Sequence, residues 1–219
     1  MNETISLGNS REFQLAQLDA DFCDRFTKEL VEGLSLLAGV KRAVTVFGSA
    51  RTAPGIELYE RGVDVGGALA RAGFTVITGG GPGAMEAANK GARDEGGQSL
   101  GLGIELPREQ GLNRFINRGV EFRHFCLRKL VMEEADAFVV MPGGFGTFDE
   151  LFEVLTLIQT AKLRRSPVIL VDTKYWKGLI SWLEDKPLSY GTISEEDLDL
   201  VHVVDTAREV LEVLRGAAS

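Results

Sequence analysis

The sequence has few of the residues that build cross-linked or metal-binding proteins. Its 219 residues include two cysteines, Cys23 and Cys126, and two histidines, His124 and His202. Two cysteines form no disulfide framework, and because both lie in apolar stretches we expect buried, reduced thiols. The histidines are far apart and form no Cys/His cluster of the kind that binds zinc. We therefore expect no metal site, and we expect His124 to have a packing or hydrogen-bonding role.

Long apolar runs and an excess of basic residues are also missing. No apolar stretch approaches the roughly 20 residues that span a bilayer, and the opening MNETISLGNS lacks the basic and apolar regions of a secretory signal. The 24 basic and 32 acidic side chains give a net charge of −8, which is unsuited to a general nucleic-acid-binding surface. We expect a soluble, cytoplasmic protein that binds neither membrane nor nucleic acid, although a locally positive pocket can still bind a small anion.

What the chain does contain is an alternation of apolar strand patterns and amphipathic helix patterns. Apolar residues at helical steps predict a leading helix within residues 11–37 that ends at Gly39. Further strands are predicted at 43–47, 74–78, 99–106, 137–141, 167–171 and 201–204, and helices at 58–71, 84–94, 125–135, 147–163, 175–183 and 207–214.

Several of the predicted strands are apolar throughout, which is typical of a parallel sheet covered by helices on both faces. Together with the alternation, this predicts a single-domain, doubly wound α/β fold of the Rossmann-like type. We assign residues 1–40 to an N-terminal extension with its helix, and residues 41–219 to the Rossmann-like domain.

Three glycine- or serine-containing loops follow predicted strands, where ligands bind in such folds. They are GSAR (48–51), TGGGPGAME (78–86) and PGGFGTFDE (142–150). Glycines let backbone amides approach a phosphate, and a following helix adds its positive end. The second loop also fits the dinucleotide fingerprint G-x-G-x-x-A, but it follows the second strand rather than the first. A single phosphate is therefore favoured over a dinucleotide, and the alternative is a tight turn with close helix–strand packing.

The loop PGGFGTFDE permits two interpretations. In the first, Thr147 is the N-cap of a helix and Glu150, three residues later, completes a capping box. That interpretation leaves Gly143, Gly144 and Gly146 unexplained. In the second, these glycines and the Thr147 hydroxyl hold a phosphate while Glu150 faces the attached sugar. An anion and a carboxylate can then share one helix start because they serve opposite ends of one ligand.

The same run also resembles a known family. PGGFGTFDE, together with VFGSAR (46–51), GGGPGAMEAANKGA (79–92), FRHFCLRKL (122–130) and PVILVD (167–172), is similar to the Lonely Guy (LOG) family, long mislabelled as lysine decarboxylases. The resemblance does not extend to residues 1–40 or to the last few tens of residues. It implies a cofactor-free enzyme that hydrolyses the N-glycosidic bond of AMP or a cytokinin riboside 5′-monophosphate, releasing free base and ribose 5-phosphate. It also implies a homodimer or a higher homo-oligomer.

By motif, the resemblance implies that Glu150 is the catalytic acid and Arg128 the catalytic arginine. A carboxylate can stabilise positive charge on the sugar and orient the attacking water, and an arginine can stabilise the departing base. The candidate phosphate and substrate contacts are Ser49, Gly80, Gly81, Gly83, Lys129, Gly143, Gly144, Gly146, Thr147 and Thr156. We interpret Arg51 as part of a solvated surface.

Two questions remain open at this stage. The segment RKLVMEEADAF (128–138) is one residue shorter than the family pattern, and a shortening inside the helix would rotate Arg128 by ~100°, leaving Arg123 as a substitute. The chain could also be a non-catalytic binder of a nucleotide or pterin cofactor, similar to molybdenum cofactor carriers. Arg128 and Glu150 together favour the enzyme, because a carrier does not need both. No motif fixes the base preference, the size of the oligomer or the physiological role.

Overall fold

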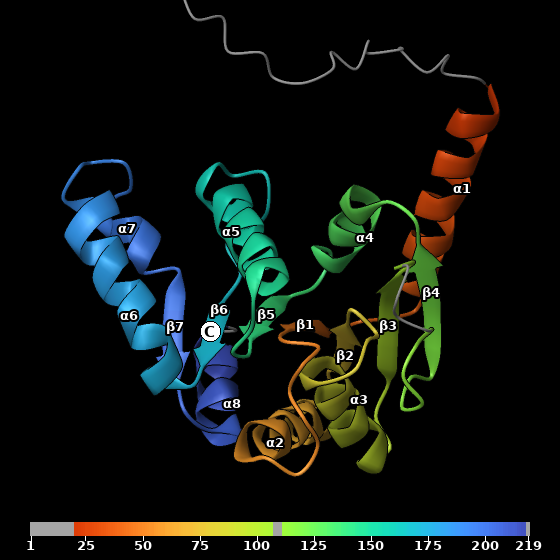
Figure 1. Ribbon diagram of the computed structural model, residues 1–219, viewed down its shortest axis with the longest axis horizontal. Coiled ribbons are helices and arrows are strands. Elements are labelled where there is room, and N and C mark those ends of the chain that lie inside the picture. Colours follow the sequence, from red (N-terminus) through yellow and green to blue (C-terminus); the bar gives the residue numbers. More distant parts are fainter. Residues whose placement is uncertain (1–19, 107–110, 218–219) are drawn as a thin grey trace, which may run out of the picture.

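Strands and helices alternate along most of the chain as the sequence predicts, except that β4 follows β3 in the element order. The computed structural model describes residues 20–106 and 111–217. Within them the elements are α1 (Ala20–Leu36), β1 (Ala43–Phe47), α2 (Glu57–Arg71), β2 (Thr75–Thr78), α3 (Ala84–Asp94), β3 (Ser99–Ile104), β4 (Arg118–Phe122), α4 (Phe125–Met132), β5 (Ala137–Val140), α5 (Phe145–Gln159), β6 (Val168–Val171), α6 (Thr173–Leu183), the π-helical turn η1 (Glu184–Leu188), α7 (Glu195–Leu198), β7 (Val201–Val204) and α8 (Ala207–Gly216) (Figure 1).

The strands form one parallel sheet in the order β4-β3-β2-β1-β5-β6-β7. The chain builds outward from β1 to β4 and then returns to place β5 on the other side of β1, where Val46 pairs with Val139 and Phe47 with Val140. The strand order therefore reverses between β1 and β5. A ligand crevice is expected outside the carboxyl ends of these two strands.

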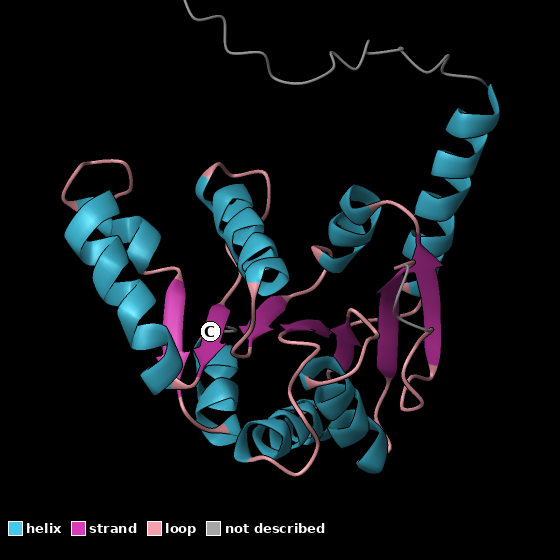
Figure 2. Ribbon diagram, viewed as in Figure 1, coloured by secondary structure: helices cyan, strands magenta, loops and turns pink. Residues whose placement is uncertain are grey.

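Helices cover both faces of the sheet (Figure 2). Helices α1, α4, α5 and α6 pack on one face, and α2, α3 and α8 pack on the other. Strand β5 illustrates why its sequence is apolar throughout: Phe138 and Val140 enter the first core, while Ala137 and Val139 enter the second. Alternate residues of a strand point to opposite faces, so a strand covered on both sides has no solvent-facing position.

The predicted doubly wound α/β fold with an N-terminal leading helix is confirmed, with one strand missed. Strand β4 reads RGVEF, and at the edge of the sheet only its last residue, Phe122, is buried. A polar edge strand lacks the apolar signal on which the strand predictions depend. The leading helix is described from Ala20, so residues 11–19 of that prediction lie outside the described residues. The boundary at residue 40 stays a prediction.

The capping interpretation of Thr147 and Glu150 is wrong. Helix α5 begins at Phe145, its N-cap is Gly144, and no side chain caps it. Thr147 is consequently the third residue of the helix, and the Glu150 side chain is directed to a partner on another helix. The expectation of buried thiols is also wrong, because Cys23 and Cys126 are both exposed on their helices. Among the described residues, no helix is long and apolar enough to cross a membrane.

Candidate active site

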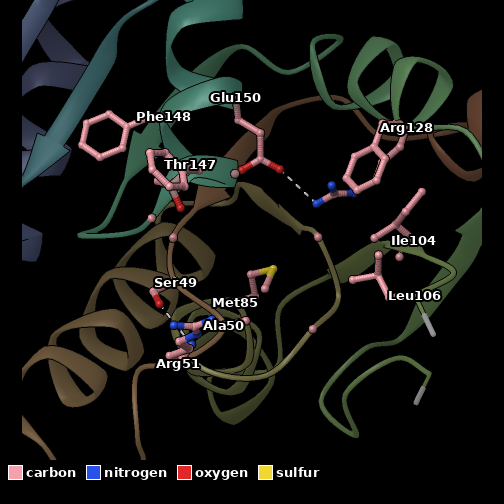
Figure 3. Close-up of a pocket in the computed structure, with 18 of the residues that line it drawn as sticks. Ser49, Ala50, Arg51, Met85, Ile104, Leu106, Arg128, Thr147, Phe148 and Glu150 are labelled. Carbon is pink, nitrogen blue, oxygen red and sulfur yellow. Dashed lines mark hydrogen bonds and ion pairs between the residues drawn. The ribbon is translucent and has the colours of Figure 1, made fainter. Parts of the chain in front are cut away.

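A cleft of about 640 Å³ lies at the carboxyl ends of the central strands (Figure 3). All three loops singled out in the sequence contribute to its lining: residues 48–51 after β1, Gly79 and Gly81 after β2, and residues 144–148 after β5. The reversal of strand order brings the first and third loops to opposite sides of one crevice. The cleft therefore occupies the position that this topology predicts for a ligand.

The start of α5 provides a row of backbone amides on one side of the cleft. The first helical hydrogen bond at this end runs from the Phe148 amide to the Gly144 carbonyl, at 3.0 Å. The amides of Phe145, Gly146 and Thr147 come before it and have no carbonyl within the helix to pair with. All of these residues line the cleft. Unpaired amides and the positive end of the helix dipole make this corner suitable for an anion.

Thr147 adds a hydroxyl to the same corner. Its side chain points into the cavity in Figure 3, although the residue is only 4% exposed. Gly143 supports it from behind, because a Cβ at Gly143 would lie 2.1 Å from the Thr147 Oγ1. The Gly143 carbonyl accepts a hydrogen bond from the Tyr175 hydroxyl. Gly143 thus shapes the corner without lining the cleft, whereas Gly144, Gly146 and Thr147 line it.

The loop after β2 is fixed by close packing. Gly83 has a φ of 73°, and a Cβ there would lie 2.3 Å from the Ser49 carbonyl oxygen, which accepts a hydrogen bond from the Ala84 amide. Gly80 also has a φ of 73°, and its carbonyl accepts bonds from both the backbone and the side chain of Asn113. Of the predicted glycines in this loop only Gly81 lines the cleft, and Gly79 joins it. No motif in the sequence pointed to Asn113.

Ser49 and Arg51 lie on the β1 side of the cleft. The Ser49 hydroxyl accepts a hydrogen bond from the Arg51 amide at 3.0 Å, so it caps its own loop as well as lining the cavity. Arg51 is exposed but belongs to the lining, which the interpretation as a solvated surface missed. Its position directly after the strand next to the reversal point was the available signal. It supplies a positive charge beside the glycine corners.

Arg128 and Glu150 meet inside the cleft. The Arg128 Nη2 donates to the Glu150 Oε1 at 3.0 Å, and the Arg128 Nε donates to the Leu102 carbonyl at 2.8 Å. The two side chains are only 8% and 11% exposed. Gly79 leaves room for this arrangement, because a Cβ there would lie 2.3 Å from the Arg128 Nη2. The guanidinium is therefore held by a strand, a loop and the partner carboxylate.

The alternative in which Arg128 turns away from the cleft is excluded by this geometry. The proposed substitute, Arg123, pairs instead with Glu105, with 3.2 Å between Nε and Oε1. Arg123 does not contribute to the cleft lining. Helix α4 ends at Met132, and Arg128 lines the cleft.

Burial raises the pKa of Glu150 to about 6, although the charge of Arg128 acts in the opposite direction. A carboxyl group in a poorly solvated site favours its neutral form, and a neighbouring cation favours the charged one. The outcome is a carboxylate that is ionised near neutral pH and a better proton acceptor than an exposed glutamate. Such a shift inside a cleft is typical of a group that exchanges protons with a ligand.

Lys129 and Thr156 lie outside the lining of the cleft. The Lys129 Nζ pairs with Asp149 at 3.1 Å and with Glu153 at 2.6 Å, which ties α4 to the outer side of α5. The Thr156 hydroxyl donates to the Phe152 carbonyl within its own helix. Their predicted contacts with a ligand have no geometric support in a single chain.

Apart from Glu121 on β4, the remaining wall of the cleft is apolar. It is formed by side chains from the start of α3, the end of β3 and the starts of α4 and α5, namely Met85, Ile104, Leu106, Phe125 and Phe145. Sequence reasoning did not assign these residues to the site. One signal could have identified Ile104 and Leu106. They lie at the carboxyl end of the apolar run at 99–106, on the same side of the sheet as the ends of the other two strands. The cleft thus combines a corner of unpaired helix amides, a buried ion pair and a mostly apolar wall.

Comparison with known proteins agrees with this organisation. A family model described as possible lysine decarboxylase matches residues 85–214. The chain is similar to the cytokinin riboside 5′-monophosphate phosphoribohydrolase of Mycobacterium marinum, with 33% identity over 159 residues, covering 71% of this chain and 84% of that protein. It is also similar to a relative of the same name from Arabidopsis thaliana, with 30% identity over 194 residues, covering 86% of this chain and 88% of that protein.

Solved structures of molybdenum cofactor proteins share the fold. The molybdenum cofactor binding protein from Rippkaea orientalis matches with a TM-score of 0.60 and 20% identity over 82% of this chain and 98% of that chain. The molybdenum cofactor carrier protein from Chlamydomonas reinhardtii matches with a TM-score of 0.57 and 23% identity over 80% and 97%. At these identities the likeness concerns the fold alone. The family model and the identity to the curated relatives, by contrast, show that the chain belongs to the Lonely Guy (LOG) family, whose model carries the description possible lysine decarboxylase.

Proposed function

We propose that this protein hydrolyses the N-glycosidic bond of a nucleoside 5′-monophosphate, either AMP or a cytokinin riboside monophosphate, and releases the free base and ribose 5-phosphate. The observation that carries the proposal is the buried pair of Arg128 and Glu150 facing a cleft that also contains the start of α5. The names of the relatives from Mycobacterium marinum and Arabidopsis thaliana support the reaction class.

The 5′-phosphate is assigned to the glycine corner at the start of α5. The amides of Phe145, Gly146 and Thr147 and the Thr147 hydroxyl offer four donors on one side of the cleft. Arg51 offers a guanidinium from the β1 side. Phosphate bound there, away from the reacting carbon, supplies positioning, because binding energy from a remote group orients the sugar without being part of the bond-breaking step.

Glu150 is assigned to the sugar and to the attacking water. As the bond between C1′ and the base nitrogen breaks, positive charge develops on the sugar ring, and the nearby carboxylate stabilises it. Glu150 also accepts a proton from the water whose oxygen bonds to C1′. The pKa of about 6 leaves the carboxylate ionised near neutral pH and suited to that transfer.

Arg128 is assigned to the departing base. The electron pair of the broken bond moves onto the base, and a fixed guanidinium next to it stabilises the developing negative charge. Because arginine stays protonated, the proton that the base needs comes through water held by the guanidinium rather than from the guanidinium itself. The same guanidinium pairs with Glu150 at 3.0 Å.

The apolar wall is assigned to the base. Met85, Ile104, Leu106 and Phe125 present an apolar surface beside Arg128. A cleft of about 640 Å³ is within the range that holds small-molecule ligands. This surface suits a flat purine ring better than a second charged group.

The test is a direct assay for base release. The protein is incubated with AMP, and in parallel with N6-isoprenoid AMP analogues, and the products are separated by chromatography. We expect adenine or the substituted base together with an equal amount of ribose 5-phosphate. Confirmed binding of these nucleotides without release of any base would favour the alternative of a non-catalytic nucleotide or pterin-cofactor binder, which the shared fold with molybdenum cofactor proteins makes the natural competitor.

A further inference from the structure

The leading helix α1 contacts the helix that carries Arg128 through one partly buried carboxylate. The Glu29 Oε1 accepts hydrogen bonds from the Arg123 amide at 2.8 Å and from the His124 amide at 3.0 Å. The Glu29 Oε2 lies 3.0 Å from the His124 Nδ1. The Glu29 side chain is only 11% exposed. One side chain of α1 thus binds three groups at the start of α4.

This contact supplies a cap that α4 lacks in its own sequence. The N-cap of α4 is His124, and its side chain makes no capping hydrogen bond. The amides before and at a helix start need an acceptor, and a negative charge at that end is favourable. Glu29 fulfils both needs from a separate helix. Burial raises the pKa of the Glu29 carboxyl, but hydrogen bonds from the His124 backbone, the His124 side chain and the Arg123 backbone outweigh it and hold the pKa below its ordinary value.

Apolar packing fixes α1 against the same region. The rings of Phe22 and Phe26 lie 5.9 and 5.2 Å from the His124 ring. Gly33 allows a close approach, because a Cβ there would lie 2.5 Å from the Phe122 Cζ and 2.9 Å from the Val131 Cγ2. Figure 1 shows α1 running alongside β4 next to α4. The position of Glu29 is therefore set by packing and does not depend on the carboxylate alone.

The capped turn leads directly to Arg128. The His124 carbonyl accepts the Arg128 amide at 3.2 Å, which is the hydrogen bond that closes the first turn of α4. The guanidinium at the far end of this residue bonds to the Leu102 carbonyl and to Glu150. A shift of about 1 Å in the backbone of α4 would thus be carried to the reacting end of the side chain, and misplacements of that size can cost about a hundredfold in rate.

We propose that Glu29 is a positioning residue that fixes the first turn of α4 and so holds Arg128 against Glu150. The leading helix then belongs to the machinery of the site, although it lies outside residues 85–214 that the family model matches. The effect on turnover rests on the proposed function, whereas the effect on α4 does not. The Arg123 side chain takes no part in this coupling, since it pairs with Glu105.

The experiment compares three variants of the full chain with the wild type, using AMP as substrate. For Glu29→Ala we expect kcat to fall about tenfold or more, because two amides at the start of α4 lose their acceptor. KM should change little, since the phosphate corner lies on α5 and the β1 loop. Glu29→Gln keeps an oxygen for the two amides and should recover most of the loss. Glu32→Ala, an exposed glutamate one residue before Gly33 on the same helix, is the matched control and should behave as wild type.

Hydrogen exchange measured by mass spectrometry reports on α4 independently of the reaction. In Glu29→Ala we expect faster exchange in peptides that cover residues 123–132 and unchanged exchange over β1 and α3. Wild-type kcat together with wild-type exchange in Glu29→Ala would overturn the proposal, and so would faster exchange spread evenly over the whole chain.

If Glu29→Ala does not fold, Glu29→Asp decides, because its shorter side chain cannot reach all three groups. A folded Glu29→Asp with wild-type kcat and wild-type exchange would mean that Glu29 only stabilises the fold. A wild-type protein that releases no base would instead contradict the proposed function, and the exchange of α4 would still test the positioning.

Discussion

At the scale of single residues, the account depends on the environment of Glu150. An exposed glutamate would be fully ionised and weakly basic at neutral pH. Here burial raises the pKa to about 6 while Arg128, at 3.0 Å, keeps the ionised form accessible. Burial therefore does not leave the carboxyl group neutral at pH 7, and the charge of Arg128 does not bring its pKa back to the ordinary value. That balance is what a group needs if it is to stabilise positive charge on a sugar and accept a proton from water.

Replacing Glu150 tests its role. In Glu150→Gln the side chain keeps its size but can neither carry the charge nor accept the proton. We expect kcat with AMP to fall by roughly 10²–10⁴-fold, while nucleotide affinity measured by calorimetry stays close to that of wild type because the phosphate corner is untouched. Asp149→Asn is the matched control, since that carboxylate is exposed and pairs with Lys129. Near-normal turnover in Glu150→Gln would show that another group does the chemistry.

The pKa of Glu150 also predicts a pH dependence. The ionised form is the active one, so activity is present above the pKa and is lost as the pH falls through it. We expect kcat/KM for AMP to decline along an acidic limb with an apparent pKa of about 6, where an unperturbed glutamate would give about 4.5. The measurement is a profile of initial rates across this range, with fold integrity checked by circular dichroism. Full activity well below the expected limb would contradict the assignment.

At the scale of elements, the site depends on corners where a strand meets a helix. Gly79 at the end of β2 is the clearest case, because an added Cβ would lie 2.3 Å from the Arg128 Nη2 and 2.8 Å from the Met85 Sδ. The loop therefore has room for the guanidinium only if this position has no side chain. Helix α4 supplies the arginine, and the loop after β2 supplies the space for its guanidinium. These two segments are distant in sequence.

Gly79→Ala should displace Arg128 without unfolding the protein. We expect a loss of about a hundredfold in kcat, because the guanidinium must move away from Glu150, and a smaller change in the thermal unfolding temperature. Gly178→Ala is the control, since nothing lies within 4 Å of an added Cβ at that position in α6, and it should stabilise the helix slightly by about 0.5–1 kcal/mol. Unchanged kcat in Gly79→Ala would mean that turnover does not require the space that Gly79 leaves for the Arg128 guanidinium.

Elements with a strong periodic pattern were predicted well, and those without one were not. The apolar strands and the amphipathic helices agree with the structure because burial on both faces fixes their sequences. Strand β4 was missed because an edge strand with one buried residue carries no such pattern. Capping rules predict the start of α5 at Thr147 because they favour a hydroxyl side chain at the N-cap. In the structure the N-cap is Gly144. Local rules fail there because the corner serves the cleft.

The site shows the same division. The motif resemblance identified Arg128 and Glu150, and the structure brings them within hydrogen-bonding distance. The resemblance could not identify Arg51 or the apolar wall, because those residues come from separate segments and meet only in the folded chain. It also could not show that the packing of two loops requires Gly83. Residues brought together by topology rather than by a contiguous motif leave little trace in one sequence.

At the scale of the whole molecule, strand order decides where the cleft lies, and exposed apolar residues suggest further assembly. The side of the sheet that carries α4 and α5 has exposed apolar side chains, including Phe125, Leu130, Phe152 and Phe145, the last of which is 96% exposed. Apolar side chains gathered on one face can mark a contact between subunits. The homodimer or larger homo-oligomer stays a prediction, and these exposed apolar side chains are the physical argument for it.

Light scattering coupled to gel filtration tests the assembly. We expect a mass at least twice the chain mass of 23.8 kDa over a wide range of concentrations. Phe145→Ser combined with Phe152→Ser should shift the equilibrium towards the single chain if this face is the contact, whereas Tyr190→Ser, an exposed aromatic next to η1, serves as the control. A wild-type mass equal to that of one chain at every concentration would contradict the prediction.

The most direct test of the central claim is a crystal structure of the Glu150→Gln variant with AMP bound. The account predicts the phosphate on the amides of residues 145–147, the base against Met85 and Phe125, and C1′ within about 4 Å of the side chain at position 150, with room for one water. Phosphate bound elsewhere, or C1′ held beyond the reach of that side chain, would contradict it.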